Sequence, residues 1–265
     1  MKLPIFSLEK EKVGEIDLPG QFNEEVNADL IKDAFLAWQS RQYQSKGNKP
    51  GAGKKSVAKL SRRRRKYRGS YGLGISRVPR KIMSRQGTRF NWVGAFSPGT
   101  VGGYRAHPPK AEEILEKKIN KKEKRKAFRS ALRAVIEKSL VLKRGHRVPE
   151  DYPFVLQSSF EGIKKTREAK SILEKLGFRE ELERTNSKKI RAGQGKLRGR
   201  KYDKKVGLLM VVSNQCDLIK AAGNIPGVNV ATIDSLNINQ LAPGAVPGRV
   251  TLFTDAAINK LRAKK

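Results

Sequence analysis

Arginine, glycine and aromatic residues are interleaved along residues 54–105 in a pattern suited to RNA. Arginine forms bidentate bonds to phosphate and stacks on bases. Glycine lets the backbone approach another chain closely, and aromatic rings stack on unpaired bases. We therefore predict RNA binding by the basic and aromatic side chains of this stretch: Lys54, Lys55, Arg62, Arg63, Arg64, Arg65, Lys66, Tyr67, Arg68, Tyr71, Arg77, Arg80, Lys81, Arg85, Arg89, Phe90, Trp92, Tyr104 and Arg105.

Two further stretches are basic. Residues 188–205 form a loop interrupted by glycines, in which Asp203 is the single acid. We predict that its cations also bind RNA: Lys188, Lys189, Arg191, Lys196, Arg198, Arg200 and Lys201. Residues 117–126 read by default as the solvated basic face of a helix, and the sequence leaves open whether part of that face also contacts phosphate.

The first of these stretches lies inside a longer segment without acids. Residues 34–111 contain no Asp or Glu but hold 19 Lys and Arg, eleven Gly and five Pro. Globular surfaces mix both signs of charge, whereas a run of one sign stays extended unless a polyanion neutralises it. With few aliphatic residues to bury, the segment cannot fold alone. We expect a phosphate backbone as its partner, since released counterions would supply affinity.

The rest of the chain is basic too. The 265 residues carry a net charge of +33, and the remainder outside residues 34–111 holds 39 basic and 25 acidic residues, or +14. Such charge fits a nucleic-acid binder, and on its own it would also fit a protein that touches anionic membranes. No apolar run is long enough for a transmembrane helix, and the first residues lack the apolar core of a signal peptide. We expect a cytoplasmic protein.

Residues that could do catalysis or hold a cofactor are sparse. The single cysteine, Cys216, excludes a disulfide framework and a multi-cysteine zinc site, and we interpret it as a partly buried structural thiol. We interpret His107 as a packing residue and His146 as a surface residue. We expect no cofactor and no metal with protein ligands; Mg²⁺ would accompany the RNA. Three acids near strand ends are interpreted as helix caps: Asp217, Asp234 and Asp255.

Nucleotide-binding loops are not supported either. No Gly-x-Gly-x-x-Gly follows a strand, and residues 51–56 resemble a phosphate loop only superficially. Lys55 stands where a P-loop needs Ser or Thr, and Asn48 stands where it needs glycine. We therefore expect no enzyme.

Periodicity indicates the elements that position these residues. Two strands are expected within residues 3–18, followed by a helix capped by Asn27 that fades near Gly47. Apolar residues over residues 47–107 follow neither the helical nor the strand period. A helix is expected to open at Pro108 and Pro109 and run to residues 143–144, with Leu142 in its buried stripe.

After Gly145 strands and helices alternate. Strands are expected at residues 154–156, 206–212, 228–233 and 250–254, and helices at 163–176, 218–222, 235–241 and 255–261. This pattern predicts an α/β protein, a three-layer α/β/α fold with a mostly parallel sheet. In addition to this fold we expect a long, basic, non-globular internal loop. The expected organisation is a globular domain of residues 1–46 and 108–265 with an RNA-penetrating loop of residues 47–107.

Five motifs carry a resemblance to a known family, the large-subunit ribosomal protein family numbered four in its archaeal and eukaryotic branch. They are Ser70-Tyr71-Gly72-Leu73-Gly74 through Arg77-Val78-Pro79-Arg80, Arg105-Ala106-His107-Pro108-Pro109-Lys110, Ala127-Phe128-Arg129-Ser130-Ala131-Leu132, Ile190-Arg191-Ala192-Gly193-Gln194-Gly195-Lys196-Leu197-Arg198-Gly199-Arg200-Lys201 and Leu241-Ala242-Pro243-Gly244. The sequence stops soon after its last expected helix, whereas eukaryotic members continue, so it resembles archaeal members.

The resemblance implies a structural constituent of the large ribosomal subunit that binds ribosomal RNA and aids subunit assembly. It implies a globular domain on the solvent side and a long loop that reaches toward the peptide exit tunnel. The loop tip would fall around residues 80–92. The expected partners are ribosomal RNA, neighbouring large-subunit proteins and, near the tip, the nascent peptide. The tunnel-lining residues would be Arg85, Gln86, Gly87, Thr88 and Arg89.

Two other functions are alternatives to this interpretation. An RNA- or nucleotide-processing enzyme would need converging acids or a phosphate loop, which the sequence does not supply. A chromatin-type DNA binder would bind duplex DNA and structured ribosomal RNA with equal affinity at physiological salt.

Overall fold

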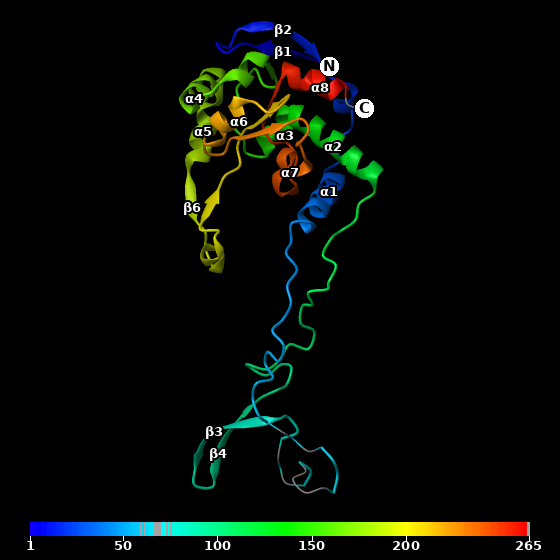
Figure 1. Cartoon of the computed structure of the whole chain (residues 1–265), viewed down its shortest axis with the longest axis vertical. Helices are drawn as coiled ribbons and strands as arrows, with labels where there is room; N and C mark the ends of the chain where they lie inside the picture. The colour runs from blue at the N-terminus through cyan, green and yellow to red at the C-terminus, as the bar shows by residue number, and fades with distance from the viewer. Residues whose placement is uncertain (59, 61, 66–69, 73, 75, 264–265) are drawn as a thin grey trace. The chain divides into compact units, whose positions relative to one another are not determined.

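A computed structural model describes residues 1–58, 60, 62–65, 70–72, 74 and 76–263. The chain divides into two units: unit 1 comprises Met1–Gln42 and Glu116–Lys265, and unit 2 comprises Tyr43–Leu115. Unit 1 holds a six-stranded sheet with helices packed against it (Figure 1).

The six-stranded sheet is mostly parallel. Its strands are ordered β2-β1-β5-β10-β8-β9; β2 runs antiparallel to β1, and the other neighbours are parallel. The predicted α/β class with a mostly parallel sheet is confirmed. The strands lie within the predicted ranges, except that β1 begins one residue earlier: β1 (Lys2–Phe6), β2 (Lys12–Asp17), β5 (Val155–Leu156), β8 (Leu209–Val212), β9 (Asn229–Thr232) and β10 (Thr251–Thr254).

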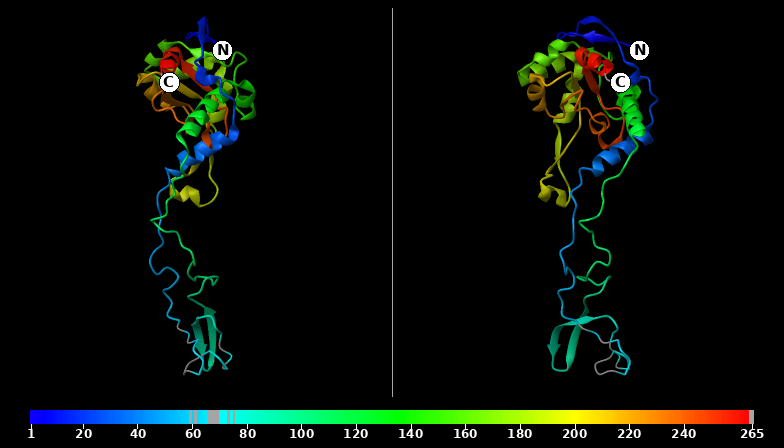
Figure 2. Two further views of the ribbon diagram at one scale, coloured as in Figure 1. Left: turned by 90° about the vertical axis from the view of Figure 1, so that its right-hand side faces the viewer. Right: turned by 45° about the vertical axis from the view of Figure 1, so that its right-hand side comes forward.

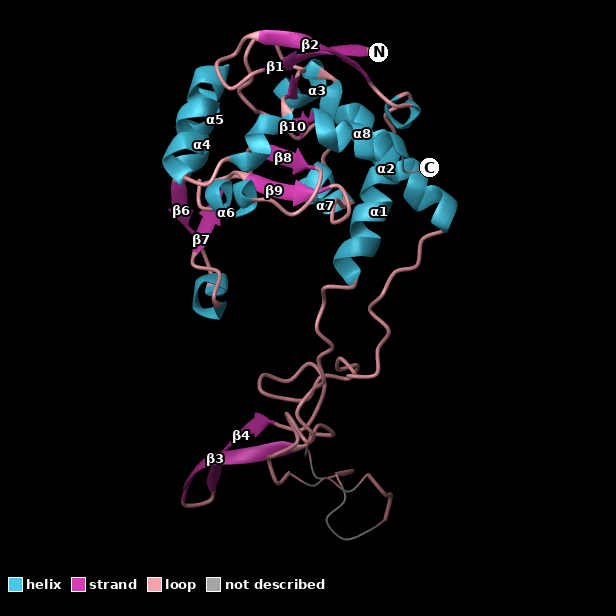
Figure 3. Cartoon of the chain, turned by 45° about the horizontal axis from the view of Figure 1, so that its top comes forward, coloured by secondary structure: helices cyan, strands magenta, loops and turns pink. Residues whose placement is uncertain are grey.

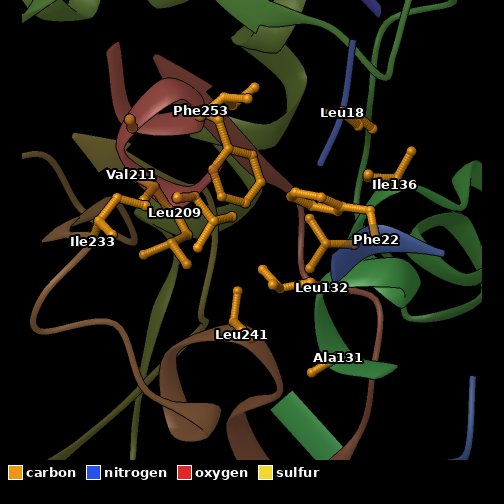
Figure 4. Packing of buried hydrophobic residues seen from close by; sticks show 14 of the residues in the cluster. Leu18, Phe22, Ala131, Leu132, Ile136, Leu209, Val211, Ile233, Leu241 and Phe253 are labelled. Atoms are coloured by element: carbon orange, nitrogen blue, oxygen red, sulfur yellow. The ribbon is translucent and has the colours of Figure 1, made fainter. Parts of the chain in front are cut away.

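Successive side chains of the central strands enter two different hydrophobic clusters. On one face Leu209, Val211 and Phe253 pack with Phe22, whose ring meets that of Phe253 edge to face at 5.7 Å (Figure 4). The helices that cover this face are α1 (Ala28–Ser40), α2 (Lys121–Ile136), α7 (Ile238–Leu241) and α8 (Asp255–Ala263).

On the other face Met210, Val212 and Leu252 enter the second cluster. Continuous apolar runs are typical of parallel strands buried on both faces, which is why β8 and β10 are apparent from sequence. The helices of this face are α3 (Lys138–Lys143), α4 (Thr166–Leu173), α5 (Arg179–Asn186) and α6 (Asp217–Gly223) (Figure 3).

Helix α1 begins as predicted and ends earlier than predicted. Oδ1 of Asn27 accepts a hydrogen bond from the Leu30 backbone N–H at 3.0 Å, which confirms the cap. The helix ends at Ser40 rather than near Gly47. Two contacts then join the ends of unit 1: the Lys117 N–H donates to Ser40 Oγ (2.9 Å), and Arg41 pairs with Glu116 (2.7 Å).

The predicted helix from Pro108 to residue 144 is wrong in two respects. Helix α2 begins only at Lys121, because Asn120 and Glu123 form a capping box there. Glu137, in extended conformation, then separates α2 from α3. This break shifts the helical phase, so that Val141 is buried and Leu142 is 49% exposed, not part of the buried stripe.

A glycine also separates the next two helices. Gly177, with φ +96°, ends the predicted helix after α4, and α5, which was not predicted from the sequence, follows directly. A short hairpin comes after α5 where a loop was predicted over residues 188–205: β6 (Lys188–Ile190) pairs with β7 (Tyr202–Lys204).

Unit 2 contains a hairpin that the sequence did not predict. Strand β3 (Arg80–Gln86) pairs antiparallel with β4 (Arg89–Gly94) (Figure 2). Most side chains of both strands are exposed, so no alternation of apolar and polar residues indicated them. Turns, bends and irregular backbone make up the other described residues of unit 2.

Candidate nucleic-acid interface

The β3–β4 hairpin gathers basic and aromatic side chains on one face. Cross-strand pairing places Ile82 opposite Trp92 and Arg85 opposite Phe90, with a register shift at Met83 between the two pairs. Because side chains alternate between faces, this bulge brings Arg85 to the face that Ile82 occupies. The Arg85 guanidinium lies 5.2 Å from the Phe90 ring centre, and the Phe90 and Trp92 rings are 5.9 Å apart.

The turn of this hairpin contains the predicted loop tip. Gln86 pairs with Arg89, so Gly87 and Thr88 form a two-residue turn, and Gly87 has φ +58°. Glycine is favoured at such positions because it has no Cβ to clash. Residues 85–89 are all exposed, and Arg85 Nε donates to the Gly87 carbonyl (3.0 Å).

A second cation–aromatic cluster joins segments far apart in sequence. Nζ of Lys54 lies 5.1 Å from the centre of the Tyr104 ring and 5.9 Å from that of Phe96, and the two rings are 5.8 Å apart. Gly53 faces the backbone of Tyr104 so closely that a Cβ could not be accommodated. Lys54 and Tyr104 are among the residues predicted from the sequence, and Phe96 is not.

These segments border a groove within unit 2. Residues 47–54 and 104–112 line a volume of about 600 Å³. Four of the lining side chains are cations: Lys49, Lys54, Arg105 and Lys110. The lining therefore attracts anions, because Glu112 is its one acidic side chain.

The arginine block and its neighbours are exposed. Nη2 of Arg62 donates to the Arg77 carbonyl (3.3 Å), and the Arg77 guanidinium stacks 4.8 Å from the Tyr71 ring centre. Among the described residues, the side chains of the other predicted cations of this part form no hydrogen bond or ion pair; Lys66, Tyr67 and Arg68 lie outside the described residues. The exposed cations are Lys55, Arg63, Arg64, Arg65, Arg80, Arg89 and Arg105, while Lys81 is half-buried.

Carboxylates do not neutralise these cations. Among the residues described in unit 2, no lysine or arginine forms an ion pair. Exposed cations beside exposed rings can bind phosphate and stack on bases at the same time.

The β6–β7 hairpin of unit 1 repeats the combination on a smaller scale. Lys188 and Lys201 place their ammonium groups 4.7 and 5.6 Å from the centre of the Tyr202 ring. Lys188 also lies directly opposite Lys204 in the strand register, a like-charge pair that destabilises a hairpin without an anion. Tyr202 was not among the predicted residues, because a three-residue strand gives no period.

The other predicted cations of this hairpin differ in their contacts. Arg191 pairs with Asp203 at 3.4 Å, and Arg198 donates to the Gln194 side chain at 3.3 Å. The hairpin end is a 3₁₀ turn, Gln194–Arg198, bounded by Gly193 and Gly199 with positive φ. Four more cations are exposed, and their side chains form no hydrogen bond with the part of the chain that the structure describes: Lys189, Lys196, Arg200 and Lys201.

Buried charges fix the root of this hairpin. Arg184 donates to both oxygens of Glu181 (2.7 and 2.8 Å) and to the Val206 carbonyl (2.8 Å), just beyond β7. Arg249 is 2% exposed and donates to the carbonyls of Gly207 (2.7 Å) and Leu208 (3.4 Å). Burial lowers the pKa of Arg249 to about 10, so it remains charged at neutral pH.

His146 belongs to the same buried cluster, so its interpretation as a surface residue is wrong. The residue is 4% exposed, and its Nδ1 lies 2.7 Å from Oε1 of Glu181. Burial would raise the pKa of Glu181, but hydrogen bonds from Arg184, His146 and the Arg147 N–H outweigh it and lower the pKa to about 2. Burial lowers the pKa of His146, which keeps the ring neutral.

The residues considered for catalysis have structural roles. Cys216 is half-buried, and burial raises the pKa of its thiol, so it is a poor nucleophile. Thr254 caps α8, since its Oγ1 accepts the Ala257 N–H (3.2 Å), so the interpretation of Asp255 as the cap is wrong. Asp255 is the first residue of the helix and accepts the Ala256 N–H (2.6 Å), and Asp234 pairs with Lys260 (2.6 Å). His107 is exposed.

The described ranges hold neither a metal-ligand cluster nor a membrane-spanning helix. Within residues 1–263, apart from the undescribed positions, no cluster of His, Cys, Asp and Glu side chains could hold a metal ion. In the same part of the chain, no helix is both long enough and apolar enough to span a bilayer.

Comparison with known proteins gives the family. The sequence model of the ribosomal protein L4/L1 family matches residues 16–264. The large ribosomal subunit protein uL4 of Nanoarchaeum equitans is 47% identical, with 100% of this chain and 99% of the relative covered. The proteins of that name from Methanocaldococcus jannaschii and Pyrobaculum aerophilum are 43% and 42% identical, covering 100% and 98% of this chain and 99% and 89% of the relatives. The chain therefore belongs to the ribosomal protein L4/L1 family.

Proposed function

We propose that this protein is a structural constituent of the large ribosomal subunit that binds ribosomal RNA and aids subunit assembly. Membership of the ribosomal protein L4/L1 family makes it a ribosomal structural component and not an enzyme. The observation that carries the RNA-binding role is the set of unpaired cations beside exposed aromatic rings in unit 2, such as Arg77 beside Tyr71.

We propose further that residues 47–107 form an extended loop that penetrates the RNA, and that residues 1–46 and 108–265 form the globular α/β domain. Self-repulsion among cations favours an extended loop, and RNA phosphates would remove that repulsion. The cations at its arginine block, Arg62 to Arg65, then bridge neighbouring RNA helices. Glycines such as Gly53 permit close packing of the loop backbone.

The tip of the loop is assigned to the nascent-peptide exit tunnel. The β3–β4 turn is narrow and ends in exposed residues, which suits a protrusion into a confined, water-filled passage. In this proposal Arg85, Gln86, Gly87, Thr88 and Arg89 line the tunnel and meet the nascent peptide.

The β6–β7 hairpin provides a second RNA contact. Its lysines flank Tyr202, and Arg184 and Arg249 hold its root against the globular domain. Neighbouring large-subunit proteins would occupy other surfaces of the domain. Any Mg²⁺ at the interface would be coordinated by RNA oxygens rather than by protein ligands.

Charge reversal in the arginine block tests the proposal. The double variant Arg64→Glu with Arg65→Glu should weaken binding to large-subunit ribosomal RNA and impair reconstitution of the subunit. Its thermal unfolding should match the wild type, because both side chains are exposed. Arg167→Glu with Lys220→Glu, two exposed positions on α4 and α6, carries the same charge change as a control. Normal reconstitution with the double variant would contradict the proposal.

A further inference from the structure

Helix α2 carries an unusual excess of positive charge. Its sixteen residues include seven lysines and arginines and one acid, Glu123. That acid serves the helix itself: Oε2 of Glu123 accepts the Asn120 N–H at 3.4 Å in the capping box. The helix therefore lacks a carboxylate to neutralise the cations on its outer surface.

Five of these cations form one continuous row, which we name the cationic ridge: Lys122, Arg125, Lys126, Arg129 and Arg133. Each of them has another member three or four residues away, so the five lie on the same side of the helix. The first four are exposed and Arg133 is half-buried. The opposite side of the helix, with Ala127, Ala131 and Val135, is buried in the first hydrophobic cluster (Figure 4 labels Ala131).

The free protein leaves the ridge electrostatically unsatisfied. Among the described residues, the ridge forms one ion pair, between Lys126 and Glu24 at 3.7 Å. Lys122 and Lys126, Arg125 and Arg129, and Arg129 and Arg133 are like-charge pairs four residues apart, and each such pair destabilises a helix. Much of this charge also lies near the helix N-terminus, where the dipole disfavours cations.

In contact with a polyanion, the cations of the ridge would contribute favourable interactions in place of their mutual repulsion. The ridge carries no exposed aromatic side chain that could stack on a base, since Phe128 packs against the core. Its contacts are therefore expected to go to phosphates and not to base edges, which gives affinity and orientation without sequence preference.

We propose that the cationic ridge is a third ribosomal-RNA contact, in which Lys122, Arg125 and Arg129 bind the phosphate backbone of one RNA strand. The inference rests on the proposed function and extends it to a helix of the globular unit. Repulsion within the ridge lowers the stability of the free protein, whereas the same cations raise its affinity for RNA. A basic helix with a purely structural role would not combine these two effects.

Neutralising the ridge tests this assignment through two readouts that should move in opposite directions. In the full-length triple variant Lys122→Gln, Arg125→Gln and Arg129→Gln, binding to large-subunit ribosomal RNA should weaken. The slope of log affinity against log salt should become shallower by about 2 to 3, from roughly 0.7–0.9 per phosphate contact. The free variant should melt at a higher temperature than the wild type, because repulsion is removed and glutamine has a similar helix propensity.

The control carries the same change of charge on the other face of the sheet. Arg167→Gln, Lys175→Gln and Lys220→Gln remove three exposed cations of α4, the following turn and α6, whose side chains form no ion pair or hydrogen bond with the described residues. This variant should keep the wild-type salt slope and affinity.

Three results would overturn the assignment. The first is a ridge variant whose affinity depends on salt as steeply as that of the wild type. The second is a control variant that loses as much RNA affinity as the ridge variant, which would make net charge the cause. In both cases Arg64→Glu with Arg65→Glu would still weaken binding, and the proposed function would survive. The third is a wild-type chain that does not bind ribosomal RNA, which would overturn the ridge and the proposed function together.

Discussion

Nδ1 of His146 lies 2.7 Å from Oε1 of Glu181, and both side chains are buried at the root of the β6–β7 hairpin. Glu181 also receives both Arg184 hydrogen bonds, and Arg184 in turn holds the Val206 carbonyl. The orientation of a basic hairpin thus depends on a buried acid. Removing one partner of such a group leaves another charge unpaired, which costs more than the pair contributes.

Acid should destabilise the protein in two stages. The pKa of His146 is lowered from 6.5 by burial, so the unfolded state takes up this proton first and stability falls as pH drops below 6.5. The pKa of Glu181 is lowered from 4.5 to about 2, so its contribution of about 3 kcal/mol is present above pH 4.5 and is lost as pH falls toward 2. Chemical denaturation across this pH range measures both stages.

The two histidines of the chain provide the matched comparison. His146→Phe should flatten the dependence of unfolding free energy on pH as the pH falls below 6.5, since no buried imidazole remains to titrate. His107→Gln changes an exposed histidine and should retain the wild-type curve. An unchanged curve for His146→Phe would show that the buried ring does not cause the upper stage.

Packing at the same root should be sensitive to one added methyl group. A Cβ at Gly207 would lie 2.5 Å from Cγ2 of Thr185 and 3.0 Å from the Gly227 carbonyl. Gly207→Ala should therefore lower the free energy of unfolding by about 1–3 kcal/mol. Adding Thr185→Ser removes the clashing methyl and should restore part of the loss. Gly14→Ala, with no neighbour within 4 Å of the added Cβ, should have little effect; a similar loss there would refute the steric explanation.

Trp92 should report RNA binding directly. It is 50% exposed, whereas Trp38, the other tryptophan, packs against the core. In a Trp38→Phe chain, ribosomal RNA should quench Trp92 fluorescence and protect it from acrylamide. Trp92→Ala should weaken binding by about 1–3 kcal/mol, the usual contribution of one stacked base. Unchanged acrylamide access in the complex would exclude Trp92 from the interface.

The sequence predicts those parts of the fold that depend on local signals. Continuous apolar runs identify β8 and β10, and Asn27 identifies the start of α1. The start of α2 also has a local signal, because the spacing of Asn120 and Glu123 is that of a capping box. The predicted start at Pro108 and Pro109 did not take this signal into account.

Other features depend on partners distant in sequence. His146 follows a turn and resembles a surface residue until Glu181, 35 residues later, is placed beside it. The β3–β4 hairpin buries no face in the chain, so a period of apolar residues was neither needed nor present. The predicted RNA-binding residues remain a prediction, supported by exposure and by neighbouring rings such as Phe96 and Tyr202.

The contacts of Ser40 with Lys117 and of Arg41 with Glu116 have a consequence for how the length of unit 2 can vary. They close unit 1 on itself, so the chain between them is, for folding, a loop whose ends are already fixed. The entropy of closing a loop rises only with the logarithm of its length, by about 0.6 kcal/mol for each doubling. Insertions and deletions in unit 2 therefore change the free energy of folding very little. The partner that surrounds this unit, and not the stability of unit 1, then determines which lengths are selected.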